Sequence, residues 1–416
     1  MNDGNLLAED PSWLAVYFAF AAVSLMYMNN EEIIAAGLEP GMGHFVELRN
    51  WYDASVFFLN KAEFVRRHDM RSLQAIAILL ALVKQMGDFD LEISFLSVGI
   101  RMAQSLGMDK EPPAVSNDPV QQELSRRVWW TLVICEWLQR PARPTCIREA
   151  DFQVNLPTLT DDDDLDSKVS LGSDDARPHP IQYHNAMIRL GYEYHRFASR
   201  LPCVAGNASA LEDFVLQADE SLAKIIDELP PHLTMFGHTD DQNVEQHLPW
   251  VRWQRESFIL ALLFYRLTIN RVLQHQWLDC EMSSSRAGAV CLSSAKALIA
   301  LVDRDSTSVA KRRSWATTSS LFSAATTLAI ELRHAMDDSI TSYGEDINRC
   351  LAFFESVQDQ NMLARQAKTV LEDFMLAKRN SKTYSSRDSH VVTHRSTNLP
   401  FNCLCMAERT GCPVFS

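Results

Sequence analysis

The 416-residue chain lacks the cysteine pairs from which small metal sites and disulfide frameworks are built. It has nine cysteines, an odd number, and none stands in a C-x-x-C pair; they are Cys135, Cys146, Cys203, Cys280, Cys291, Cys350, Cys403, Cys405 and Cys412. Zinc sites and disulfide-stapled domains both need closely and regularly spaced cysteines. The sequence therefore predicts neither, and it indicates a reducing compartment.

A hydrophobic run long enough to cross a membrane is also missing. The longest apolar run, residues 13–28, has 16 residues, whereas a helix needs about 20 to span a bilayer. Glu9 and Asp10 precede it, so it lacks the basic start of a signal peptide. Asp10 followed by Pro11 is typical of a helix N-cap and first turn. We expect a buried helix here and no membrane partner.

Positive charge is scarce, because 39 Lys and Arg stand against 53 Asp and Glu and give a formal net charge of −14. Proteins that bind nucleic acids neutralise phosphates with a local excess of Lys and Arg. The chain as a whole has no such excess. We therefore expect protein partners or small molecules rather than a polyanion.

The alternation of apolar and polar residues that marks β-strands is nearly absent, whereas helical spacing is frequent. The clearest apolar stripe, which predicts one buried helix face, consists of Leu91, Phe95, Val98, Met102 and Leu106. Gly87 and Gly107 stand where glycines end helices, so 72–86 and 90–106 are predicted to form an antiparallel hairpin. Further helices are expected at 118–138, 181–199, 209–229, 250–276, 288–303, 314–336 and 345–378. The prediction is an all-α fold of antiparallel helical hairpins without a significant sheet.

Composition divides the chain only near its C-terminal end. With 47% hydrophobic and 22% charged residues the chain is globular in composition, and no long flexible linker is evident before residue 378. Residues 379–416 are polar, rich in Ser and Thr, and without periodicity. We predict one helical domain over 1–378 and a disordered polar tail over 379–416.

One acidic run has the form of a metal site. Asp162-Asp163-x-x-Asp166 matches the D-D-x-x-D pattern with which all-helical terpene synthases bind magnesium. That motif needs its carboxylates on one helix face, whereas the Gly, Ser and Pro around this run favour a solvated loop. No second metal motif, no H-E-x-x-H and no complete serine-acylase set is present. We assign no catalytic, cofactor-binding or metal residue and expect no enzyme; a lyase using Asp161–Asp166 is the alternative.

Two stretches, 72–112 and 125–157, carry a series of motifs. The first ends in an A-x-x-L-G-M turn at residues 103–108, and the second opens with R-R-x-W-W. The matching residues of the second stretch are Arg126, Arg127, Trp129, Trp130, Arg143, Pro144, Asp151, Leu156 and Pro157. Both stretches resemble the fungal-specific transcription factor domain, the middle homology region of fungal zinc binuclear cluster transcription factors. A weaker likeness extends the resemblance over roughly 13–374. Glu136 departs from the Asp usual in the family, and Ala142 from the Gly.

The resemblance implies a nuclear protein, also present in the cytoplasm, that regulates transcription. Its implied partners are other transcription regulators or coregulators and a small-molecule effector. The family's six-cysteine zinc cluster is missing from this sequence, so we expect the chain to start inside the regulatory domain, to hold no zinc cofactor, and to reach DNA only through an upstream cluster or a partner. A Trp pair beside Arg residues anchors a helix between two layers while Arg pairs with acids or carbonyls. We interpret the motif as structural; direct ligand contact is the alternative.

The sequence thus predicts a regulator of a fungal metabolic or secondary-metabolite gene set that acts through a helical effector or interaction domain. Two rivals come from other classes of protein. One is the terpene-synthase-like lyase that uses the acidic run. The other is a scaffold that has lost regulation.

Overall fold

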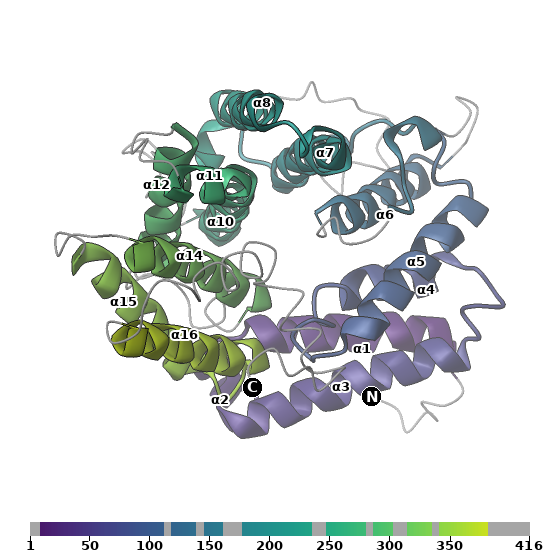
Figure 1. Cartoon of the computed structure of the whole chain (residues 1–416). Coiled ribbons are helices and arrows are strands. Elements are labelled where there is room, and N and C mark those ends of the chain that lie inside the picture. Colours follow the sequence, from purple (N-terminus) through teal and green to yellow (C-terminus); the bar gives the residue numbers. More distant parts are fainter. Residues whose placement is uncertain are drawn as a thin grey trace. The chain divides into compact units, whose positions relative to one another are not determined.

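The computed structural model describes residues 9–111, 118–138, 145–160, 177–234, 247–279, 286–302, 314–334 and 341–381. These residues fold into α-helices joined by turns and short 3-10 helices (Figure 1). Within these ranges no strand forms, and the only β-type pairing is an isolated parallel bridge between Lys110 and Gln153. The all-α prediction is confirmed. None of the described helices combines the length and apolarity that a membrane span requires.

Contacts divide the chain into two compact units, and each has its own hydrophobic core. The first unit comprises residues 1–199 and 224–258, and the second comprises 200–223 and 259–416. The domain boundary predicted at residue 378 stays a prediction. It falls inside a helix that continues to Ser381, and most of the predicted tail lies outside the described residues.

The first unit is built from helices near the N-terminus: α1 (Pro11–Tyr27), α2 (Asn30–Ala35), α3 (Met42–Lys61), α4 (Met70–Leu79), α5 (Phe89–Ser105) and α6 (Pro119–Trp137). Helix α1 packs against α3 and α4, and α4, α5 and α6 contact one another. Apolar side chains of α1 and of α3 to α6 form one continuous core. Three further helices, α7 (Pro180–Val204), α8 (Ala208–Asp227) and α10 (Pro249–Asn270), contribute residues to both units.

Local signals in the sequence set the ends of several of these helices. Asp10 and Asp118 each precede a proline and accept a backbone N–H bond from the first turn of α1 and α6. Gly87 and Gly107 have φ of +80° and +74°, a conformation that glycine adopts without steric cost. The predicted start of α1, the bounds of α6 and the turn at Gly107 are therefore confirmed. The helix predicted over 72–86 is too long, because α4 ends at Leu79 and turns lead from there to Gly87.

Two predicted buried faces need correction. The sequence predicts a buried helix over 13–28, but Trp13, Tyr17 and Phe20 of α1 are exposed, because α3 and α4 cover only its other face. Leu106, predicted to lie on a buried stripe, is also exposed, because α5 ends at Ser105 and the chain leaves the helix there. The helix α3 itself was not predicted.

The second unit has α14 (Trp315–His334) in contact with α12 (Arg286–Val302), α15 (Thr341–Val357) and α16 (Met362–Ser381). The single helix predicted over 345–378 is wrong. The chain breaks before α16, where Asn361 accepts the N–H of Ala364 at 3.2 Å and so begins a new helix.

The single helix predicted over 250–276 is also interrupted. Helix α10 ends at Asn270, and a 3-10 turn (Arg271–Leu273) leads into α11 (Gln274–Asp279). The side-chain amide of Asn270 donates to the carbonyl of Arg266 at 2.9 Å, where it competes with the backbone N–H of a regular α-helix.

Candidate functional site

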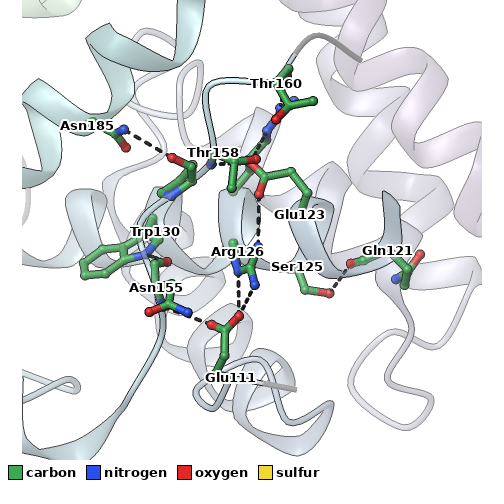
Figure 2. Close-up of polar contacts among 12 residues, drawn as sticks. Glu111, Gln121, Glu123, Ser125, Arg126, Trp130, Asn155, Thr158, Thr160 and Asn185 are labelled. Atoms are coloured by element: carbon green, nitrogen blue, oxygen red, sulfur yellow. Dashed lines mark hydrogen bonds and ion pairs between the residues drawn. The ribbon is translucent and has the colours of Figure 1, made fainter. Parts of the chain in front are cut away.

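The motif residues that the structure describes lie on α6 and on segment 145–160, which is fastened to α6 (Figure 2). Arg126, Arg127, Trp129 and Trp130 lie on α6, and Asp151 lies on the segment. Arg143, Pro144 and Ala142 lie outside the described residues, as does the acidic run 161–166. Beyond that gap, the first turns of α7 also contact the segment.

Glu123 is the buried acid at the centre of this arrangement. Its side chain is almost inaccessible, and Oε1 accepts both the Nε–H of Arg127 at 2.9 Å and the backbone N–H of Thr158 at 3.0 Å. Oε2 lies 3.5 Å from Nη1 of Arg126. A buried carboxylate is tolerated where opposite charges and N–H groups surround it. One side chain therefore joins two turns of α6 to the far end of the segment.

A second acid, Glu111, holds the other side of Arg126. Both Nε and Nη2 of Arg126 donate to Oε1 of Glu111, and Oε2 accepts the backbone N–H of Asn155 at 3.0 Å. Burial alone would raise the pKa of Glu111, but the hydrogen bonds from Arg126 and Asn155 outweigh it and lower that pKa. The carboxyl group is thus held ionised. Figure 2 shows the pair between α6 and the segment.

Side chains of α6 also bind the backbone of the segment at further points, among them the carbonyl of Thr160, which accepts from Nη2 of Arg127 at 3.3 Å. Trp130 donates from Nε1 to the carbonyl of Asn155 at 2.9 Å, and Trp137 donates to that of Ile147 at 3.0 Å. Glu136 accepts the N–H of Cys146 at 2.5 Å. Glu136 thus has a defined partner although it departs from the family's usual Asp.

An aromatic cluster fills the space between the polar contacts. Phe152 of the segment lies with its ring centroid 5.4 Å from both Trp129 and Trp130 and 5.9 Å from Trp137. Trp129 and Trp130 are 0% and 1% exposed. Edge-to-face and tilted contacts of this kind add to the burial of large rings. The tryptophans therefore anchor Phe152 as well as their own helix.

Asp151, the charged motif residue of the segment, is not part of this network. It is exposed, and its Oδ2 accepts hydrogen bonds from the backbone N–H and the Nε–H of Arg148, both at 3.3 Å. This contact closes the short 3-10 helix Glu149–Asp151. Asp151 shapes the segment locally and does not reach the arginines of α6.

Helix α7 presents a buried histidine to the same region. Burial lowers the pKa of His184 to about 4, and the charge of Arg127 acts in the same direction. The imidazole is therefore neutral near pH 7. The adjacent Asn185 donates to the carbonyl of Pro157 at 3.2 Å.

This arrangement positions a chain segment and shows no reaction chemistry. Each charged side chain described above bonds to another side chain or to the backbone, whereas Nε2 of His184 and Nε1 of Trp129 are buried without a hydrogen-bond partner among the described residues. Among the residues that the structure describes, no three His, Cys, Asp or Glu side chains come together as a metal site would require. The direct ligand contact considered for the motif stays an untested alternative.

Sequence reasoning missed Glu111, Glu123 and Phe152. Glu123 carried a usable signal, because it lies three and four residues before Arg126 and Arg127 on a predicted helix, where side chains meet. Glu111 and Phe152 carried none. Their roles depend on how the chain folds back along α6.

The sequence matches the family described as the fungal specific transcription factor domain over residues 16–202. It is 26% identical over 227 residues to the aurofusarin cluster transcription factor aurR2 of Gibberella zeae, covering 53% of this chain and 32% of the relative. It is 30% identical over 222 residues to the C6 finger domain transcription factor hasF of Aspergillus fumigatus, covering 49% of this chain and 28% of the relative. It is 25% identical over 264 residues to the probable transcription factor lepB of Aspergillus flavus, covering 58% and 46%.

Each matched region covers less than half of the relative's length. The family match includes α6 and segment 145–160 but ends at residue 202, so the weaker likeness noted in the C-terminal half stays a prediction. The motifs and the match agree over the part of the chain that contains the network around Glu123. The chain therefore contains a fungal specific transcription factor domain, formed by residues 16–202.

Proposed function

We propose that the chain is a non-enzymatic transcription regulator of a fungal metabolic or secondary-metabolite gene set. The observation that carries the proposal is the family match over residues 16–202. The relatives support it because they are named as transcription factors, one of them for the aurofusarin cluster. Such a regulator works in the nucleus, with a cytoplasmic pool.

The helical domain acts in this proposal as an effector sensor or a protein-interaction platform. Its partners are other transcription regulators or coregulators, and a small-molecule effector. The network around Glu123 supports this role, because buried charges and tryptophans hold segment 145–160 in one defined position on α6. A ligand or partner that needs this segment in place would find it pre-organised.

In this proposal a zinc cluster outside these 416 residues recognises the DNA, because no cysteines here have the spacing of a zinc cluster. The cluster can belong to a partner chain or to a preceding segment. In either case this chain holds no zinc itself.

The test is deletion of the gene in its fungus, followed by complementation. We expect transcripts of a linked set of genes to change on deletion and to return with the parent chain. A chain with Glu123→Ala should complement poorly, whereas Asp151→Ala, a matched change at an acid outside the network, should complement. A fluorescent fusion reports whether the chain enters the nucleus. An unchanged transcriptome would favour a scaffold without regulatory function.

The lyase alternative has its own decisive assay. Magnesium-dependent turnover of a prenyl diphosphate by the purified chain, abolished by Asp162→Ala with Asp166→Ala, would replace the regulator with an enzyme. The family match and the relatives favour the regulator.

A further inference from the structure

The outer face of α1 is unusual for a surface helix. No residue of α1 is charged, and its exposed positions are all aromatic: Trp13 (46% exposed), Tyr17 (49%) and Phe20 (65%). They are spaced four and three residues apart and therefore lie on one side of the helix. Phe57 of the neighbouring α3 is 58% exposed. We call Trp13, Tyr17, Phe20 and Phe57 the aromatic face.

Ring contacts join the two helices into one surface. Trp13 stacks on Tyr17 with centroids 5.5 Å apart, and Tyr17 meets the edge of Phe18 at 5.3 Å. Phe18 stacks on Phe58 of α3 at 5.6 Å, and Phe58 contacts Phe57 at 5.2 Å. Trp13 and Phe57 are thus the two ends of a continuous aromatic series that includes Tyr17. Phe20 follows Tyr17 by three residues on the same side of α1. A contiguous apolar patch of this kind marks an interaction site more often than scattered exposed residues do.

Positive charge gathers at one end of the aromatic face, in contrast to the chain's net charge of −14. Residues 57–71 contain four basic residues, Lys61, Arg66, Arg67 and Arg71, against two acidic ones. Lys61 places Nζ 5.8 Å from the centroid of Phe58. Lys61, Arg67 and Arg71 line an open hollow of about 610 Å³ between the end of α3 and the starts of α1 and α4, together with the acids Asp10, Glu63 and Asp69.

The acids around that hollow are already engaged. Asp10 caps α1 and pairs with Arg71 at 2.6 Å. Asp69 caps α4, and Glu63 pairs with Arg66 at 3.0 Å and with Arg67 at 3.6 Å. Arg66 and Arg67 share the single carboxylate of Glu63, and Lys61 has no ion pair among the described residues, so Lys61 and the highly exposed Arg67 are the cations that an incoming carboxylate would meet.

We infer that the aromatic face is a docking surface for an acidic amphipathic segment of another protein. Apolar side chains of that segment cover Trp13, Tyr17, Phe20 and Phe57, and its carboxylates bind Lys61 and Arg67. The inference concerns a surface away from segment 145–160 and stands whether or not the chain regulates transcription.

The size of the aromatic face favours a short segment over a second copy of the chain. A large aromatic side chain buries roughly 150–250 Å² when fully covered, and these four are about half exposed. The face therefore offers on the order of 400 Å², half of the roughly 800 Å² per partner in a stable interface. A helical or extended peptide with a few anchors fits this area.

The test measures binding of two fluorescein-labelled amphipathic peptides to the full chain by fluorescence anisotropy. Both carry Leu and Phe along one helical face. The first peptide has Glu at all remaining positions, and the second has Lys at those positions. We expect micromolar binding of the Glu peptide and binding at least about tenfold weaker for the Lys peptide.

Two variants of the chain localise the binding. Tyr17→Ser with Phe20→Ser should weaken binding of the Glu peptide about tenfold or more, and Lys61→Glu should do the same. Leu376→Ser, which removes an exposed apolar side chain in the second unit, is the matched control and should bind like the parent. Unchanged melting temperatures show that the variants fold, as expected for exposed positions.

Several outcomes would overturn the inference. They are no binding of the Glu peptide at millimolar concentration, equal binding by the Tyr17/Phe20 double variant, and equal binding of the Lys peptide. Sedimentation that shows a parent dimer, turned into a monomer by the double variant, would assign the aromatic face to a second copy instead.

Discussion

Trp130 contributes both apolar burial and a buried hydrogen bond to the fold. Trp130→Ala should lower the free energy of unfolding by about 3–5 kcal/mol, the usual cost of removing a large buried aromatic ring, and Trp129→Ala should cost the same. Trp130→Phe keeps most of the ring but leaves the carbonyl of Asn155 without its donor, and should cost about 1–3 kcal/mol. Urea denaturation measures all three.

The exposed Trp13 provides the matched control for these variants. Trp13→Ala should change the free energy of unfolding by less than about 0.5 kcal/mol. A Trp130→Ala protein that melts within about one degree of the parent would contradict the anchoring role, since a loss of several kcal/mol moves the midpoint further than that in a domain of this size.

Glu123 joins two arginines and a backbone N–H in a buried position. Glu123→Ala should destabilise the fold by about 3–5 kcal/mol, because the partners of a broken buried ion pair are left without compensation. Glu123→Gln keeps an acceptor for Arg127 and Thr158 and should cost less. Chemical denaturation distinguishes the two substitutions.

A surface pair gives the comparison for Glu123. Glu220 lies 3.7 Å from Arg286, with both side chains well exposed, and Glu220→Ala should cost no more than about 1 kcal/mol. If the Glu123 and Glu220 variants lost equal free energy of unfolding, burial of the Glu123 network would add nothing to the stability of the fold.

His184 should make stability depend on pH in a defined window. Its pKa is about 4 in the folded chain, whereas an unfolded histidine titrates near pH 6.5. Between these pH values the unfolded state binds a proton that the folded state does not, so stability falls as the pH drops from about 6.5 to 4. Above pH 6.5 the histidine contributes nothing to the pH dependence of stability. The full effect is at most about 3 kcal/mol.

The measurement is the free energy of unfolding between pH 7 and pH 4 for the parent and His184→Gln. The variant should lose less stability than the parent over this range. His68→Gln, at an exposed histidine, should follow the parent. A His184→Gln curve parallel to that of the parent would show that the imidazole is protonated in the folded state as readily as in the unfolded one.

The residues of the site differ in how far sequence could identify them. Arg126, Arg127, Trp129 and Trp130 follow from a motif on one predicted helix, and local spacing sets their neighbours on α6. Phe152 belongs to an irregular segment, and its contact with three tryptophans arises only when the chain folds back. Short-range sequence patterns do not indicate that segment 145–160 folds back along α6.

At the scale of the element, Asn361 explains why one predicted helix is two. Its Oδ1 caps α16 at Ala364, and its Nδ2 donates to Thr318 of α14 at 2.9 Å. Asn361→Ala removes the cap and a buried hydrogen bond and should cost about 1–2 kcal/mol. Thermal unfolding measures this cost. The exposed Asp359, two residues earlier in the same turn, is the control, and Asp359→Ala should be nearly neutral.

Helix bounds were predictable where the chain marks them chemically. An Asp-Pro pair stands at the start of α1 and of α6, and a glycine with positive φ stands on each side of α5. The structure uses each of these local signals. Helix α3 was missed because its apolar residues mix with Asn, Asp and Ser around the helix rather than forming one clear stripe. The breaks at Asn270 and Asn361 were missed because asparagine side chains create them through hydrogen bonds within the fold. The apolar periodicity of the sequence continues across both asparagines and therefore predicts an unbroken helix.

At the scale of the whole molecule, composition could not separate the two compact units. Apolar residues continue through α7, α8 and α10, and each of these helices contributes residues to both units. No proline- or glycine-rich linker marks the change. The boundary is a property of which side chains meet, and the predicted single domain over 1–378 stays a prediction.

The charge of the whole chain leads to the last prediction: the isolated 416-residue chain should bind duplex DNA no better than non-specifically at physiological salt. Affinity for DNA grows with the number of phosphates that Lys and Arg neutralise. A net charge of −14 opposes that approach, and the cysteines lack the spacing of a zinc cluster. We expect dissociation constants of about 1 µM or weaker, lost steeply as salt increases.

Gel shifts with promoter fragments of the genes that respond to deletion test this expectation. The same chain fused to a zinc-cluster reader is the positive control, and it should bind selectively because the added module supplies base contacts. Nanomolar, sequence-selective binding by the unfused chain would locate a DNA reader in these helices. The basic group at residues 57–71 would then be the first place to look, since there four basic side chains outnumber two acidic ones; Lys61→Glu would test this assignment by weakening DNA binding.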